Sequence, residues 1–244
     1  MPGPYECALV LAIGLVAGTV SGIVGFGASI IVMPVLVILF GPQRAVPIMA
    51  VVSILVNLSR ILVWWREIAW RPSLTYASTA APAAALGART LLELPPHLVE
   101  AALGAFFLAM IPVRRVLAAR NLRITLWQLA IVGALIGYVT GIVASTGPIS
   151  VPVFLALGLV KGAFLATEAA SSLAIYVSKA ATFRALGALS SELALAGLII
   201  GSSLMAGSII ARRFVVKLER ERFELLMDGL LVVSGSTMLW FARP

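Results

Sequence analysis

Polar and ionisable side chains recur at helical spacing within two otherwise apolar stretches of the chain. Ser53, Asn57 and Arg60 fall at i, i+4 and i+7, which places them on one face of a helix. A second face, at i, i+4, i+8 and i+11, carries Glu168, Ser172, Tyr176 and Lys179. Ionisable groups inside an apolar span are costly and are candidate functional residues, and cationic, hydroxyl and amide groups are donors that bind anions. These faces therefore predict an anion site.

Two copies of one broken apolar segment precede these faces. Residues 14–24 align without a gap on residues 133–143, with six identities in eleven positions. Each copy breaks into small polar residues, GFGAS at 25–29 and ASTGP at 144–148, before the apolar run resumes. The chain is therefore predicted to be a duplication built on an interrupted membrane segment. Glycines spaced four apart are expected to let another helix approach closely: Gly14, Gly18, Gly22, Gly133, Gly137 and Gly141.

The composition indicates a membrane protein. Hydrophobic residues make up 61% of the 244 and charged residues 11%, against about 25% charged residues in an ordinary soluble domain. The mean hydropathy is +1.08. The apolar runs are about 20 residues long, which is the length of a membrane-spanning helix, whereas a membrane barrel shows alternating segments of about ten residues. The predicted fold class is all-α integral membrane.

Several classes of function lack the residues that they need. The net charge of +8 does not indicate a nucleic-acid partner, because the basic residues lie in short connections between spans. Cys7 and His97 are single, so we expect no disulfide and no metal site. The sequence has no paired acids, no nucleophile–base motif and no P-loop, so we expect no cofactor, no ATP coupling within the chain and no enzyme activity.

Apolar runs between polar connections divide the chain into two repeats of the same layout. Each repeat begins with a hairpin whose second arm, about 12 residues or roughly 18 Å of helix, is too short to span alone. The first repeat, 1–120, has a hairpin at 6–40 and spans at 45–64, 73–92 and 98–117. The second repeat, 121–244, has a hairpin at 126–158 and spans at 163–183, 191–211 and 223–242.

Basic residues predict the orientation of these spans. They crowd the connection between the repeats and the last connection, so both connections are expected on the cytoplasmic side. This orientation agrees with the number of spans only if each hairpin enters and leaves on the same face of the membrane. Each repeat then has three full crossings, and because three is odd the second repeat is inverted relative to the first. Both termini then lie outside the cytoplasm. The basic residues are Arg114, Arg115, Arg120 and Arg123, and then Arg212, Arg213, Lys217, Arg220 and Arg222.

The hairpin tips are the best candidates for a binding site, because irregular backbone within a membrane must be buried in protein or line a cavity. Ser29 can cap the first short helix and Ser145 or Thr146 the second, which leaves backbone N–H groups and a positive dipole end aimed at the tip. The alternative is that the glycines only permit a tight bend. The candidate tip residues are Gly25, Phe26, Gly27, Ala28, Ser29, Ser145, Thr146 and Gly147.

A glycine-rich break followed by an apolar turn and a proline, Pro34 or Pro152, occurs once in each half. In this layout the chain is similar to the sulfite exporter TauE/SafE family of bacterial anion transporters. The resemblance includes the stretch KGAFLATEA at 161–169, which contains Thr167, and the later Lys179. Three consecutive glycines are common in the family where this chain has Gly27-Ala28-Ser29 and Thr146-Gly147-Pro148.

The resemblance implies a secondary transporter of the bacterial cytoplasmic (inner) membrane that moves sulfite or a small organosulfonate. The expected mechanism is alternating access around a site near the middle of the bilayer. The candidate substrate-binding residues beyond the tips are Asn57, Arg60, Thr167 and Lys179. An anion channel with a static filter at the hairpin tips is the alternative.

The roles of the ionisable residues stay open at this point. Arg60 and Lys179, which the repeat offset of 119 residues pairs, lie near predicted span ends and either line the anion path or extend to the lipid headgroups. Glu168 either carries a coupling proton, restrains Lys179 through Tyr176, or is a structural carboxyl group. Glu168 and Tyr176 are therefore the candidates for coupling or gating.

We predict that the connection at 113–124 is cytoplasmic and that both termini are extracytoplasmic, because the basic residues and the number of crossings agree only in this orientation. Topology reporters fused at Arg120 and at Pro244 measure the two sides directly. A cytoplasmic signal from the fusion at Pro244 would contradict the inverted arrangement of the repeats.

Overall fold

The computed structural model describes residues 4–24, 28–119, 123–159, 161–211 and 228–240, except for 230, 234 and 238. All elements in these parts of the chain are helices, as the predicted all-α fold class requires. The first half contains α1 (Pro4–Val24), α2 (Ala28–Phe40), α3 (Pro42–Trp64), a 3-10 turn (Trp65–Glu67), α4 (Trp70–Glu93) and α5 (Pro96–Ala119). The second half contains α6 (Leu126–Ile142), α7 (Gly147–Leu155), α8 (Lys161–Ala185) and α9 (Ser191–Ala211).

Helices occupy every predicted segment up to residue 211, with bounds that differ by a few residues. The second arms are short: α2 has 13 residues and α7 has 9, so α7 is about 14 Å long and cannot span a bilayer alone. Three described helical stretches are long and apolar enough to cross a membrane, namely Pro42–Glu67, Pro96–Val113 and Ser191–Ala211. Part of the predicted span 223–242 lies outside the described residues, together with Arg120, Arg212, Arg213, Lys217, Arg220 and Arg222.

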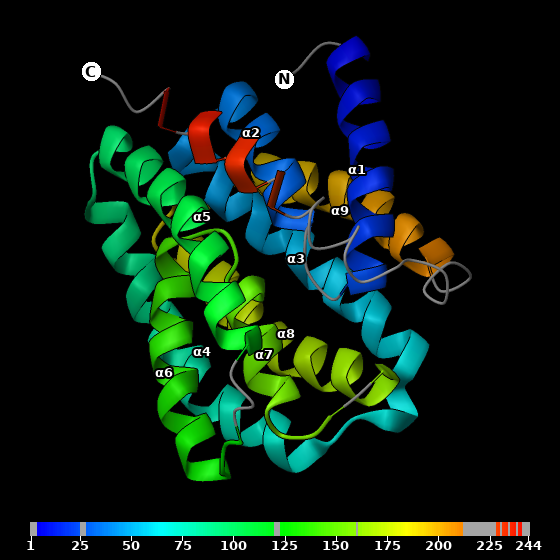
Figure 1. Cartoon of the computed structure of the whole chain (residues 1–244). Coiled ribbons are helices and arrows are strands. Elements are labelled where there is room, and N and C mark those ends of the chain that lie inside the picture. Colours follow the sequence, from blue (N-terminus) through cyan, green and yellow to red (C-terminus); the bar gives the residue numbers. More distant parts are fainter. Residues whose placement is uncertain are drawn as a thin grey trace.

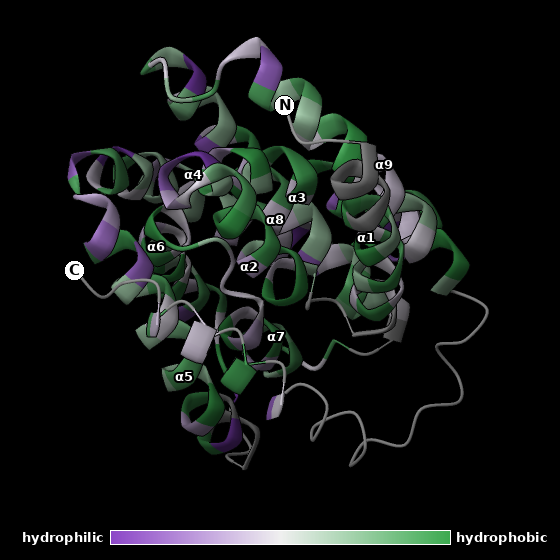
Figure 2. Ribbon diagram, turned by 90° about the horizontal axis from the view of Figure 1, so that it is seen from above, coloured by the Kyte–Doolittle hydropathy of each residue, from purple (hydrophilic) through white to green (hydrophobic). Residues whose placement is uncertain are grey.

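The two central helices, α3 and α8, run antiparallel. At one end, Trp64 of α3 packs so closely on Gly162 of α8 that a Cβ on this glycine would overlap the indole ring. At the other end, Gln43 near the start of α3 and Gly187 just beyond α8 line the same cavity. Helices α4 and α6 lie on one side of this pair and α1 and α9 on the other (Figure 1). The view from above also places α3 and α8 between these groups, with apolar residues dominating the helices (Figure 2).

Glycine faces bring helices of the two halves into backbone contact. A Cβ added at Gly18 would overlap the carbonyl oxygen of Leu204 in α9, and one added at Gly137 would overlap that of Ala80 in α4. Helix α1 therefore packs on α9, and α6 packs on α4. These contacts confirm the packing role expected of the glycines, since only a residue without a side chain permits this approach.

Helix α5 packs against the last described segment of the chain, which runs in the opposite direction. Gly235 lies against Gly104 near the middle of α5. Towards the end of α5, the Nε of Arg115 donates a hydrogen bond to Oδ2 of Asp228 at 3.0 Å. This contact places Asp228, at the start of the last described segment, beside the last turns of α5.

We expect Gly137→Ala to destabilise the protein by about 1–3 kcal/mol, because the new methyl group would force α6 away from α4. Thermal unfolding of the purified protein in detergent, followed by circular dichroism, measures the loss. Gly229→Ala is the matched control, since a Cβ at Gly229 has no neighbour within 4 Å. Equal unfolding temperatures for the two variants would contradict the close approach of the helices.

Candidate functional site

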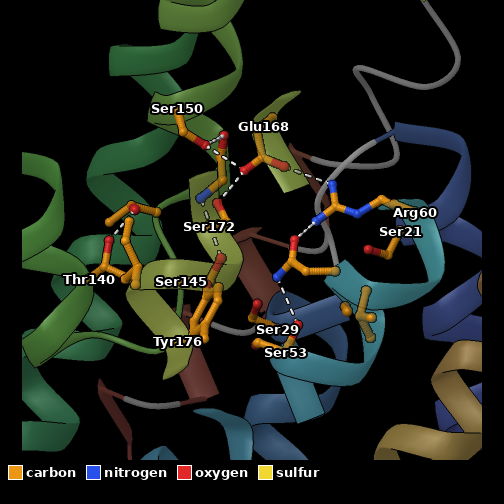
Figure 3. Close-up of a pocket in the computed structure, with 16 residues that line it drawn as sticks. Ser21, Ser29, Ser53, Arg60, Thr140, Ser145, Ser150, Glu168, Ser172 and Tyr176 are labelled. Atoms are coloured by element: carbon orange, nitrogen blue, oxygen red, sulfur yellow. Dashed lines mark hydrogen bonds and ion pairs between the residues drawn. The ribbon is translucent and has the colours of Figure 1, made fainter. Parts of the chain in front are cut away.

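A buried cavity of about 30 Å³ lies where the two hairpin tips meet the central helices (Figure 3). It is lined from α1, α2 and α3 of the first half, and from α6, α7, α8 and the second tip. Both polar helix faces predicted from the sequence contribute to it. The lining residues are Ser21, Ala28, Ser29, Ser53, Val56, Asn57, Arg60, Thr140, Ser145, Thr146, Gly147, Ser150, Glu168, Ser172, Ile175 and Tyr176.

An ion pair between the two halves crosses this cavity. The Nη1 of Arg60 in α3 lies 2.8 Å from Oε2 of Glu168 in α8, and the two side chains are 6% and 4% exposed. The Nη2 of Arg60 donates to Oδ1 of Asn57, whose Nδ2 in turn donates to the carbonyl oxygen of Ser53 at 2.7 Å. Removing one partner of a buried pair typically costs about 3–5 kcal/mol, because the other charge is left uncompensated. The pair therefore fixes α3 against α8.

The second carboxylate oxygen of Glu168 is held by hydroxyl groups. Its Oε1 accepts hydrogen bonds from Ser172 at 2.8 Å and from Ser150 at 3.3 Å. Ser150 belongs to the short helix α7, so Glu168 connects the second hairpin to the central helices (Figure 3). Guanidinium and hydroxyl donors satisfy both oxygens of the ionised carboxylate.

The second tip differs from the expected arrangement in its hydrogen bonds. The backbone N–H of Gly147 donates to the Oγ of Ser145 at 3.3 Å, whereas the N–H groups of Ile149 and Ser150 donate to the carbonyl oxygen of Thr146. Because Pro148 has no N–H, the first turn of α7 offers no free backbone donor. The expectation of free N–H groups at this tip is therefore wrong, and the donors that face the cavity are side chains.

The remaining hydroxyl groups link the tip to the helices. The side chains of Thr140 in α6 and Thr146 at the tip lie 2.5 Å apart, oxygen to oxygen. Tyr176 lines the same cavity as Ser145 and Ser53. Hydroxyl groups both donate and accept, so they can reorient around a bound anion.

Most of the residues that line the cavity form pairs of equivalent positions, 119 residues apart, in the two repeats. Ser53 corresponds to Ser172, and Asn57 corresponds to Tyr176. The remaining pairs in the lining are Ser21 with Thr140, Ala28 with Gly147, and Val56 with Ile175. Ser21, Thr140 and Ser150 were not among the residues predicted from the sequence. The offset itself is a signal that could have found Ser21 and Thr140, because each copy of the broken segment carries a hydroxyl group at this position.

Comparison with known protein families identifies the family of this chain. The family described as "Sulfite exporter TauE/SafE" matches residues 10–238. The chain belongs to this family. Its membership and its apolar helices make it a multi-pass membrane protein of an anion transporter family. A search of curated proteins found no match, and neither did a search of solved structures.

Lys179 does not face the cavity of this family member. Its side chain is fully buried, and its Nζ donates to the carbonyl oxygens of Thr140 and Val143, each at 2.6 Å. These carbonyls end helix α6, where backbone acceptors lack intrahelical partners. The alternative in which Glu168 restrains Lys179 through Tyr176 is therefore wrong, because Glu168 pairs with Arg60. Extension to the lipid headgroups is also wrong for both cations, since both are buried.

Of the other candidate residues that the structure describes, Thr167 does not line the cavity. Thr167 is buried beside it, and its Oγ1 accepts a hydrogen bond from the N–H of Ala69 at 2.9 Å, which joins α8 to the start of α4. Gly25, Phe26 and Gly27 of the first tip lie outside the described residues. A search of the described residues for clusters of His, Cys, Asp and Glu found no group that could hold a metal ion.

We expect Lys179→Met to destabilise the protein by about 1–3 kcal/mol, because it leaves two carbonyl oxygens at the end of α6 without their donor. Thermal unfolding in detergent measures this change. Val177→Met, on the exposed side of the same helix, is the matched control. A Lys179→Met protein as stable as this control would show that the two hydrogen bonds do not secure the tip.

Proposed function

We propose that this chain moves sulfite across the membrane by alternating access, with the cavity between the hairpin tips as its binding site. The observation that carries the proposal is a buried guanidinium, that of Arg60, in a small cavity otherwise lined mainly by hydroxyl groups. Membership of the sulfite exporter family supports the substrate. The hydroxyl groups of Ser29 and Thr146 face the same cavity from the two tips.

The guanidinium of Arg60 supports an anionic substrate that takes the place of Glu168 as its partner. Opposite charges about 4 Å apart attract by about 4 kcal/mol at an effective dielectric constant of about 20. A planar guanidinium also binds oxyanions through two parallel hydrogen bonds. Part of this attraction offsets the cost of removing the anion from water, and the hydroxyl donors around the cavity offset more of it.

The size of the cavity favours sulfite over an organosulfonate. A cavity needs about 10–15 Å³ to hold one water molecule, so about 30 Å³ accommodates roughly two. The pyramidal sulfite ion has four heavy atoms and needs more room than this, so the lining side chains would have to shift to admit it. The carbon chain of an organosulfonate needs further space, which the buried Ile175 and Val56 occupy.

Two inverted repeats would let the same site open to either side of the membrane. The antiparallel arrangement of α3 and α8 supports inversion, because the repeat offset makes these helices equivalent. The pairing of equivalent residues in the cavity supports the duplication itself. The N–H of Ile124 donates to the carbonyl oxygen of Ala156 at 3.4 Å, so the two ends of the second hairpin lie close together, which supports the predicted topology.

The burial of the cavity favours a carrier over a channel. Except for Ser145, which is partly exposed, the lining residues are buried. A channel needs a continuous hydrated path, whereas a carrier encloses its substrate. An ion pair that joins α3 to α8 across the site is also an element that can break and re-form during a conformational change.

Arg60→Gln is expected to lower sulfite transport by about tenfold or more, equivalent to about 1.4 kcal/mol or more of lost anion binding. Counterflow of labelled sulfite in proteoliposomes, with incorporation verified, measures this loss and distinguishes a carrier from a channel. Arg44→Gln, an exposed arginine of the same helix, is the matched control and should transport like the wild type. A counterflow rate for Arg60→Gln equal to that of the wild type would contradict the proposed site.

A further inference from the structure

The partner of Arg60 occupies the position that a bound anion would need. The Nη1 of Arg60 is taken by Glu168, and both side chains line the cavity. We propose that Glu168 is the binding site of a proton that is taken up together with the anion, so that one proton accompanies each anion. This inference rests on the proposed function, because it assigns the coupling ion of the same site.

Competition for one guanidinium is the physical reason for the coupling. An anion bound to Arg60 within so small a cavity comes close to the carboxylate of Glu168. Two like charges at this distance repel strongly, and a carboxylate removes the repulsion by taking up a proton. The protonated carboxyl group can then donate a hydrogen bond to the anion, and Arg60 is released to bind it.

The surroundings of Glu168 suit both protonation states. Its Oε1 is bonded to the hydroxyl groups of Ser150 and Ser172. A hydroxyl group donates to a carboxylate and can accept from a protonated carboxyl group after a rotation about its C–O bond. The contacts that position Glu168 can therefore persist when its charge is neutralised, while its bond to Arg60 is exchanged for one to the anion.

The other titratable groups near Glu168 do not compete for this role. Arg60 faces it from α3, Tyr76 from α4, and Tyr176 lies on its own helix. Arginine stays protonated, and phenols are neutral below about pH 10. From α7 the neighbour is the uncharged Ser150. Lys179, further along α8, is bonded to α6 carbonyls.

The stoichiometry follows from the asymmetry of the repeats. The position 119 residues before Glu168 is Met49, which cannot hold a proton. Among the described residues that line the cavity, Glu168 is the one carboxylate. The two-fold pattern of the lining is therefore broken at this position, and the site has room for a single coupled proton.

Isothermal titration calorimetry tests the inference on the purified full-length protein. Sulfite is titrated in buffers of different ionisation enthalpy, which counts the protons taken up per anion bound. We expect the number of protons taken up per sulfite to be higher in the wild type than in Glu168→Gln, by as much as one. Both proteins are titrated at the same pH, so the ionisation of free sulfite is the same in both and the difference is assigned to the substituted side chain. Glu192→Gln, an exposed acid at the start of α9, is the matched control and should keep the wild-type count.

The outcomes separate this inference from the proposed function. Sulfite binding with equal proton counts in the wild type and Glu168→Gln would overturn the proton site and leave the anion site standing. Absence of sulfite binding by the wild type would overturn both. Infrared difference spectra of the wild type provide the second measurement if the variant does not fold. Adding sulfite should produce a protonated-carboxyl band, and its absence on binding would overturn the inference.

Discussion

The ion pair of Arg60 and Glu168 is the interaction on which the centre of the molecule depends. It joins two residues that are 108 positions apart in the chain, and it lies where water cannot screen the charges. A buried charge is tolerated only with its partner and its hydrogen bonds, so Asn57, Ser150 and Ser172 are bound to the pair for the same reason. One electrostatic constraint thus positions α3, α7 and α8 together.

The helices around this centre are held by a different force. In a bilayer, burial of apolar surface drives helix association little, because lipid tails are as apolar as the side chains. Close backbone packing replaces it, at Gly18 against α9 and at Gly137 against α4. The surrounding helices therefore depend on the absence of side chains, whereas the centre depends on specific polar side chains.

The sequence was informative where local pattern decides the structure. Apolar length and glycine breaks predicted the helices, and helical spacing placed Asn57, Arg60, Glu168 and Tyr176 on faces that meet in the cavity. The partners across helices were not predictable, because spacing along one helix does not show which residue lies opposite on another. For this reason restraint of Lys179, on the same helix, was one of the three alternatives for Glu168, and the pairing with Arg60 was not predicted. The hydrogen bonds of the second tip were missed because they depend on its backbone geometry.

The first arm of each hairpin packs on a helix from the other half of the chain, so the two halves cannot be separated without exposing these arms. Helix α1 packs on α9 and α6 packs on α4. Each half of the sequence therefore supplies the surface that covers the first hairpin arm of the other half. A chain severed near residue 120 would leave α1 and α6 with their glycine faces uncovered. The duplicated segments are consequently not two autonomous modules. They form one packed unit, in which the helices that pack together come from different repeats.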